Sequence, residues 1–433
     1  MKPNKKTADL IIYAAVVVFA VVFLYAGNII ASGDWEGFGS FHDDEWQFRT
    51  AEARVTAILH VEETWDTEWM VNIQRTFEAS IVRSAYSGEV GATVVAVQNI
   101  ANYFGVQPNE IAEGDRVVLI FFPPMFPGDE AESEGEGEGE WYFLEHVRIN
   151  AIGVLGAAFV ILLVIFGRAK GFNAVLSLGF TCSAIFAVFI PSLLSGGNIY
   201  VSALIVCAYS VVVTLFMLNG VNQKSLAAAA GCLGGIFAAA LLTLLMGGAL
   251  RLTGMANREL ESLLFLPVEN PIDLHAVLFA GIIIGAVGAV IDVAVSIASA
   301  LWELRAASPG LPFSGFLKSG INIGRDIMGS MTNTLVLAYI GSSLPAILIL
   351  IVSSDSLTDL FNNELVIVEL LKAIIGAMGI LFALPLTALT CAAMYSRGGT
   401  DKTGGGGESE PSGQGADEYE DYIAELGRSL NQE

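Results

Sequence analysis

The sequence predicts a mostly α-helical membrane protein, with about eight transmembrane helices and a small β-domain inserted after the first. Hydrophobic residues make up 54% of the 433 and charged residues only 15%, which is far from the balance of soluble proteins. Eight apolar stretches approach or exceed the roughly 20 residues that a bilayer-spanning helix needs. One region, 31–148, instead alternates apolar and polar residues over short runs, as β-strands do.

The first apolar stretch, 10–30, follows three lysines and is long enough to span a bilayer. A secretory signal peptide has a similar basic start, and Ala31-Ser32-Gly33 resembles a cleavage site, so removal of this segment is the alternative. We expect a retained helix over 1–30, with its amino terminus in the cytoplasm.

The β-domain is expected over 31–148, as a small barrel or sandwich. Its predicted strands are separated by turn signals such as Ser87-Gly88 and Gly114-Asp115; they are 53–59, 69–73, 77–82, 93–97 and 116–122. The loop 128–140 alternates Glu and Gly and is expected to be solvated, with a divalent-ion site as the alternative. Whether the protein holds a metal is left open.

Seven further apolar segments form the predicted transmembrane domain, 149–395; they are 151–167, 172–194, 199–220, 226–250, 274–302, 327–352 and 365–395. Their short loops carry lysine and arginine on the side of the amino terminus, for example Arg168, Lys224 and Arg305. By the positive-inside rule, both termini are cytoplasmic and 31–148 is extracytoplasmic. This pattern predicts a multi-pass protein of a prokaryotic plasma membrane.

The formal charge of −23 belongs to the soluble parts. Region 31–148 contributes −17 and the tail 396–433 contributes −6. This acidity disfavours nucleic acid as a partner, and the tail's composition predicts a disordered cytoplasmic segment. All four cysteines lie in apolar stretches, and no nucleotide-binding, hydrolase or zinc motif occurs. We therefore expect no cofactor and no catalytic residue, and a protein that is not an enzyme.

A stripe of small and polar residues marks one face of the segment 274–302. Its members recur at steps of three or four, which places them on one side of a helix; they are Gly281, Gly285, Gly288, Asp292, Ser296, Ser299 and Glu303. No large apolar side chain belongs to this face, so it is unsuited to lipid. For the three glycines we expect helix packing.

A second stripe follows on the next helix, where Asn322, Asp326, Gly329 and Asn333 repeat the spacing. Two such faces on consecutive helices suggest a buried meeting surface. The connection 308–315 is rich in Pro and Gly, and is either a plain cytoplasmic loop or the start of a re-entrant piece that brings Asn322, Arg325 and Asp326 to membrane depth.

Asp292 is the main candidate residue, because an ionised carboxylate deep in a membrane costs several kcal/mol unless it is paired, hydrated or protonated. One interpretation is a structural contact to Arg325 or to amides and hydroxyls of the next helix. The other is a proton or cation site in a water-filled cavity, with Asp292, Ser296, Asn322, Asp326 and Asn333 supplying oxygen ligands.

The two striped segments, IGAVGAVIDVAVSIASALWE (284–303) and SGINIGRDIMGSMTNTLVLAY (319–339), resemble the signature of the YibE/F family of multi-pass bacterial membrane proteins. The resemblance seen in the sequence extends from the first helix through the β-domain to about residue 352. It implies a membrane architecture and leaves the activity open, since the family is functionally uncharacterised.

The function predicted from these residues is that of a permease or channel-like transporter for a small ion or solute, using an intramembrane carboxylate. In that scheme Arg325 and Asp326 form a cytoplasmic gate or charge pair. The alternative is a scaffold or sensor whose external β-domain binds an envelope partner. A homo-oligomer fits either function, because small-residue stripes serve contacts within and between chains.

Overall fold

The computed structural model describes residues 5–33, 49–67, 70–84, 86, 88–103, 109–122, 139–266, 268, 271–308 and 310–396. The acidic loop 128–140 and the tail 396–433 lie outside these residues, apart from Gly139, Glu140 and Ser396. Along the chain the long elements are α1 (Lys5–Ser32), β1 (Arg49–Thr67), β2 (Met70–Ser84), β3 (Thr93–Tyr103), β4 (Arg116–Phe122), β5 (Glu140–His146), α2 (Ile149–Ala184), α4 (Ile199–Asn219), α5 (Gln223–Ala249), α7 (Leu274–Ala307), α8 (Phe313–Ser353) and α10 (Glu364–Ser396). Short helices connect them: α3 (Ile190–Leu194), α6 (Arg258–Ser262) and α9 (Leu357–Asn362).

The β-domain is a closed five-stranded barrel in the order β1-β2-β3-β5-β4, with β4 pairing back to β1. The β3–β5 pair is parallel and the other pairs are antiparallel. Alternate residues point inward, as Val117 and Leu119 of β4 do, because successive side chains of a strand face opposite sides. Phe77 fills the centre of this small core. Of the two predicted β-folds, a barrel and a sandwich, the structure therefore confirms the barrel.

Two details of the predicted strands differ from the structure. The runs 69–73 and 77–82 are parts of one long strand, β2, which bends around the barrel opposite the irregular register of β1. The fifth strand, β5, was not predicted: its aromatic run Trp141-Tyr142-Phe143 resembles the start of a membrane segment, whereas these residues pair with β4 to close the sheet.

Helix α7 is central to the helical domain and packs against α4, α5, α8 and α10. One face of it is almost continuously buried, from Ile283 through Val290 and Ile297 to Leu301. Asp273 caps its first turn, since the side chain accepts a hydrogen bond from the backbone N–H of Ala276 at 3.2 Å. By length and composition, seven helices among the described residues could cross a membrane, with 149–194 taken as one of them. The chain thus has the character of a membrane protein.

The chain reverses direction inside α2, at Arg168, whose backbone has φ 51° and ψ −130°. A Cβ at Gly171 would overlap the carbonyl oxygen of Leu163, although residues eight apart in a straight helix are about 12 Å apart. After the reversal, Asn173 accepts a hydrogen bond from Tyr13 at 3.1 Å, and Asn28 donates to the carbonyl of Ala187 at 2.7 Å. The limb 172–194 therefore runs alongside α1 in the same direction.

Helix α8 is continuous from Phe313 to Ser353 and includes Asn322, Arg325 and Asp326. The re-entrant interpretation is wrong for the described residues, because no break separates these three side chains from the rest of the helix. The connection from α7 is a short turn, in which Leu311 donates its N–H to the carbonyl of Ser308.

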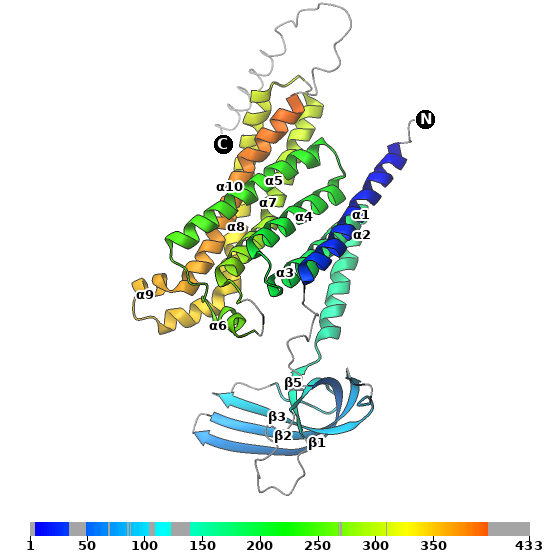
Figure 1. Cartoon of the computed structure of the whole chain (residues 1–433), viewed down its shortest axis with the longest axis vertical. Coiled ribbons are helices and arrows are strands. Elements are labelled where there is room, and N and C mark those ends of the chain that lie inside the picture. Colours follow the sequence, from blue (N-terminus) through cyan, green and yellow to red (C-terminus); the bar gives the residue numbers. More distant parts are fainter. Residues whose placement is uncertain are drawn as a thin grey trace, which may run out of the picture.

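The barrel lies at one end of the molecule, and the first turn of α1 and the last turn of α10 lie towards the other (Figure 1). The connections that contain α6 and α9 lie at the barrel end of the helical domain (Figure 1).

Candidate functional site

Asp292 lies near the middle of α7, with about 27 Å of helix before it and about 22 Å after it. It belongs to the α7 stripe, which we define as Gly281, Gly285, Gly288, Asp292 and Ser296, on the side opposite the buried face. In this single chain the stripe is exposed rather than buried between α7 and α8, apart from the half-buried Ser296. The neighbouring helices cover the other face of α7, so they leave most of the stripe open; Tyr339 of α8 reaches it at Gly285.

A cavity of about 350 Å³ opens beside Asp292, between the second limb of α2, α4 and α7. We call it the central cavity. Gly288 and Asp292 line it from α7, and much of the remaining wall is apolar. Four hydroxyl groups also line it, from Ser177, Thr181, Ser210 and Thr214. Two of them bond each other, since Ser177 donates to Thr214 at 2.9 Å. One carboxylate with several hydroxyls is a set of oxygen groups suited to a proton, a small cation or water.

The side chain of Asp292 has no ion pair or hydrogen bond within the part of the chain that the structure describes. Ser296 uses its hydroxyl to donate to the backbone carbonyl of Asp292 at 2.8 Å, so it does not compensate the carboxylate. Arg325, the neutraliser considered from the sequence, is exposed on α8 and forms no ion pair with Asp292. Among the described residues, the carboxylate of Asp292 therefore has no partner of the kind that the structural interpretation requires.

The polar stripe of α8 does not join the central cavity. Asn322, Arg325, Asp326 and Asn333 all lie on its exposed face. The opposite face is buried against neighbouring helices: Gly324 approaches Leu384 of α10, and Gly320 approaches Leu301 of α7. The structure thus separates Asp292 from the α8 residues with which the spacing had grouped it.

The three glycines of the α7 stripe have different surroundings. A Cβ at Gly281 or Gly288 would meet no atom within 4 Å. A Cβ at Gly285 would lie 2.6 Å from the hydroxyl oxygen of Tyr339 on α8, so this residue is the one of the three against which a neighbouring helix packs closely. Only a glycine gives that hydroxyl room.

A second polar pocket, which the sequence reasoning missed, lies further along the same stripe. We call this cavity of about 430 Å³ the outer pocket; Asn257, Gly281, Tyr339, Ser343, Glu369 and Lys372 contribute to its lining. Lys372 donates to Glu369 at 2.6 Å and Ser343 donates to the other carboxylate oxygen at 2.5 Å. A signal was present in the sequence, because an acid and a base three residues apart interrupt an apolar helix and share one of its faces.

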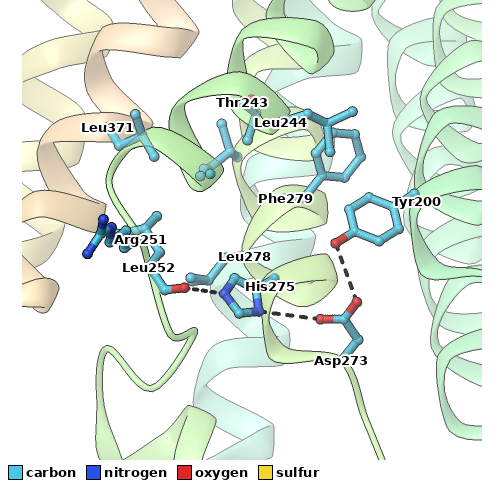
Figure 2. A pocket seen from close by; sticks show the side chains of 13 residues that line it. Tyr200, Thr243, Leu244, Arg251, Leu252, Asp273, His275, Leu278, Phe279 and Leu371 are labelled. Atoms are coloured by element: carbon cyan, nitrogen blue, oxygen red, sulfur yellow. Dashed lines mark hydrogen bonds and ion pairs between the residues drawn. The ribbon is translucent and has the colours of Figure 1, made fainter.

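A third cavity, of about 310 Å³, lies where α5 ends and α7 begins (Figure 2). Three of its polar side chains are connected: Tyr200 donates to Asp273 at 3.4 Å, and His275 contacts both Asp273 and the carbonyl oxygen of Leu252. Since Asp273 also caps α7, these contacts fix the turn between two helices. They account for Tyr200, Asp273 and His275 without a ligand; Arg251 also lines this cavity.

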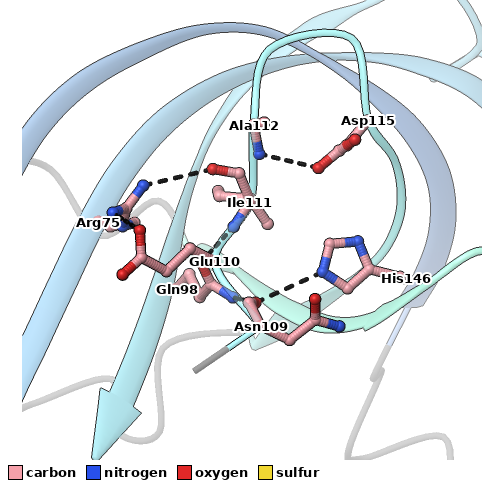
Figure 3. Close-up of polar contacts among 8 residues, drawn as sticks. All are labelled: Arg75, Gln98, Asn109, Glu110, Ile111, Ala112, Asp115 and His146. Carbon is pink, nitrogen blue, oxygen red and sulfur yellow. Dashed lines mark hydrogen bonds and ion pairs between the residues drawn. The ribbon is translucent and has the colours of Figure 1, made fainter. Parts of the chain in front are cut away.

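Polar contacts also close one end of the barrel (Figure 3). Buried Gln98 donates to the carbonyl of Asn109 at 3.1 Å and accepts from the N–H of Ile111 at 3.2 Å. Arg75 donates to the carbonyl of Ile111 at 3.3 Å and also contacts Glu110. These bonds hold Ile111 in the barrel core, where only 1% of its surface is exposed. The cluster is structural. Among the described residues, no group of three His, Cys, Asp or Glu side chains is placed to hold a metal ion.

The model of the family described as YibE/F-like protein matches residues 155–397, more than half of the chain. The chain belongs to the YibE/F-like family. The match covers every residue that lines the central cavity and the outer pocket, whereas α1 and the barrel precede it, so the resemblance noted for those parts is outside the matched range. Comparison with curated proteins and with solved structures gave no match. The family assignment is consistent with the apolar helices and supplies no activity.

Proposed function

We propose that this YibE/F-like protein is a permease or channel-like transporter of a prokaryotic plasma membrane, which moves a small ion or solute past Asp292. The observation that carries the proposal is the unpaired carboxylate of Asp292, midway along α7 and facing the central cavity. An acid at that depth is expensive to keep, and in membrane proteins such acids mark ion and proton pathways. The proposed activity is transport and not catalysis, and it needs no cofactor.

The proposed topology has eight membrane crossings. The segment 149–194 has 46 residues, about 69 Å of helix, which is twice the thickness of a bilayer core. The reversal at Arg168 divides it into two limbs of membrane-spanning length. Lys224 lies in the first turn of α5 and Arg305 in the last turn of α7, where Arg305 donates to Gln223 of α5 at 2.6 Å and lies over the ring of Tyr395 near the end of α10. Arg168 lies at the reversal of α2, at the other end of the first limb from the barrel. The last turn of α10 is on the side of the helical domain away from the barrel (Figure 1). The positive-inside rule makes that side cytoplasmic and the barrel extracytoplasmic.

In the proposed mechanism Asp292 takes up a proton or a cation, and the hydroxyls from α2 and α4 supply further oxygen ligands or hold water. Gly288 beside Asp292 keeps the cavity wide, because it adds no side chain there. The residues of α8 act elsewhere. Their polar face is unsuited to lipid, and we propose that a second copy of the chain covers it, with Arg325 and Asp326 offering complementary charges. Light scattering of the purified protein measures the number of copies.

The transport proposal is tested by flux in proteoliposomes that contain the full chain, with proton-sensitive and cation-sensitive dyes under an imposed gradient. Asp292→Asn keeps the size of the side chain and removes its charge. We expect flux with the wild type and loss of at least nine-tenths of it in Asp292→Asn, at an unchanged melting temperature. Asp355→Asn is the matched control, because Asp355 is exposed in the turn after α8 and lines neither the central cavity nor the outer pocket.

Absence of protein-dependent flux, with Asp292→Asn melting at a lower temperature, contradicts the transport proposal. It favours the second candidate, a scaffold or sensor whose barrel binds an envelope partner. The observation that favours this candidate is the exposure of Leu59 and Val61 on β1, 54% and 42% of their surface. Pull-down with barrel variants Leu59→Ser and Val61→Ser then tests partner binding directly.

A further inference from the structure

We propose that the outer pocket is a binding site for a small zwitterionic solute, a molecule with one carboxylate and one ammonium group. The proposal goes beyond the transport function, because it rests on the groups that line this pocket and requires no flux. The pocket's volume of about 430 Å³ lies within the range of small-molecule sites.

The first argument is that the outer pocket holds unused hydrogen-bond donors. The hydroxyl of Tyr339 is buried and has no partner within the described part of the chain. Lys372 has three N–H groups and spends one of them on Glu369. Asn257 accepts from the N–H of Leu260 at 2.9 Å through its oxygen, which leaves its amide N–H groups available. A buried donor without a partner costs about 1–3 kcal/mol, so a ligand that offers acceptor oxygens is favoured here.

The carboxylate next to Lys372 is already neutralised. Both oxygens of Glu369 receive a hydrogen bond, one from Lys372 and one from Ser343. The ammonium group of Lys372 repels a second cation from this part of the pocket. The group that fits the three donors is a carboxylate, whose two oxygens provide about four acceptor positions.

The second argument is charge. Glu369 balances Lys372, and Glu259 in the lining has no ion pair among the described residues. With Glu259 included, the outer pocket carries one net negative charge. A simple anion would bring a second uncompensated negative charge next to it, whereas the ammonium group of a zwitterion would compensate Glu259. One ligand therefore satisfies both the donors and the free carboxylate.

The third argument is position. Gly281 lines the outer pocket and Gly288 lines the central cavity, two turns further along the α7 stripe. Gly285 lies between them, and the hydroxyl of Tyr339 stands over it. Tyr339 thus lines the outer pocket and borders the route along the stripe towards Asp292. Its hydroxyl is covered without a ligand, and in the proposed complex a small shift of the ring brings it to the ligand's carboxylate.

Calorimetry on the full chain in detergent or nanodiscs tests the proposal, with glycine, alanine and β-alanine as zwitterionic probes. Acetate and methylammonium each present one of the two charged groups. We expect at least one zwitterion to bind, with acetate and methylammonium at least tenfold weaker. Tyr339→Phe removes a hydroxyl that has no partner without a ligand. It should lower the zwitterion's affinity about tenfold, the value of a hydrogen bond to a charged group, and the ligand-free variant should melt at the same or a higher temperature than the wild type.

Tyr13→Phe is the matched control: the same atom is removed far from the outer pocket, where the hydroxyl donates to Asn173. Its affinity for the zwitterion should equal that of the wild type. Absence of binding by all three zwitterions overturns the proposal, as does equal binding of acetate, or an affinity that Tyr339→Phe leaves unchanged. Asp292→Asn should still bind the zwitterion in the outer pocket. Loss of flux in that variant tests the transport proposal, and failure of zwitterion binding tests the present one, so the two results are distinguishable.

Discussion

The hydroxyl oxygen of Tyr339 lies 2.6 Å from the place that a Cβ of Gly285 would occupy. This contact between α8 and α7 stands between the two cavities along the α7 stripe. Any residue other than glycine at 285 must move the tyrosine ring, and real Cβ atoms do not approach an oxygen so closely.

Gly285→Ala is therefore expected to displace Tyr339 and to lower both flux and zwitterion binding several-fold, at a stability cost of about 1–2 kcal/mol. Proteoliposome flux and calorimetry measure these effects. The double variant Gly285→Ala/Tyr339→Phe has room for the methyl group and should regain stability. Gly156→Ala is the control, because its Cβ would meet nothing within 4 Å and it lines neither cavity.

Gly171→Ala is expected to destabilise the protein by about 3 kcal/mol or more, because the new Cβ would overlap a backbone atom, the carbonyl oxygen of Leu163, which cannot move without opening the reversal. Thermal unfolding in detergent measures the loss. Gly179→Ala in the same limb is the matched control, with open space around its Cβ; it should be neutral or slightly stabilising. Equal melting temperatures for both variants would show that the chain does not reverse at this point.

Lys372→Met is expected to destabilise the helical domain by about 3 kcal/mol, because it leaves the mostly buried carboxylate of Glu369 without its cation. Lys372→Met/Glu369→Gln removes both charges and should recover most of that loss. The pair's coupling follows from the unfolding free energies of the two single variants and the double variant. A coupling near zero would contradict the ion pair.

Gln98→Leu is expected to destabilise the barrel by about 2–3 kcal/mol, since the buried N–H of Ile111 loses its partner and the carbonyl of Asn109 keeps only its 3.5 Å contact with His146. Hydrogen exchange of the barrel amides locates the effect at residues 109–115. Gln74→Leu on the exposed side of β2 is the control and should change the exchange rates little. Unchanged protection at Ile111 in Gln98→Leu would contradict the assigned hydrogen bonds.

The sequence was sufficient for the membrane character and for the small β-domain, because apolar length and period-two alternation are local properties of the chain. It also placed the turn near Arg168, since two basic residues and a glycine interrupt an apolar run there. It failed at β5, whose aromatic residues satisfy a strand and a membrane interface equally well.

The candidate site was predicted only in part. Helical spacing shows which residues of α7 share a face, and it selected Asp292 and Gly288, which do line one cavity. Spacing cannot show which helix lies opposite that face. The helices that face Asp292 are α2 and α4, and not α8. This long-range arrangement depends on how α7 packs among four other helices. The same holds for Glu369 and Lys372. Their spacing is visible in the sequence, but only the fold shows that Ser343 and Tyr339 lie beside them.

The connection between barrel and helices is very short, since β5 ends at His146 and α2 begins at Ile149. Val147 still belongs to the barrel through its N–H bond to the carbonyl of Arg116, and the first limb of α2 has no buried residue. The barrel is thus connected almost directly to a helical limb about 28 Å long. Because no residue of this limb is buried, little packing opposes a tilt of the limb. A displacement of the barrel is therefore transmitted along this limb to the reversal at Arg168.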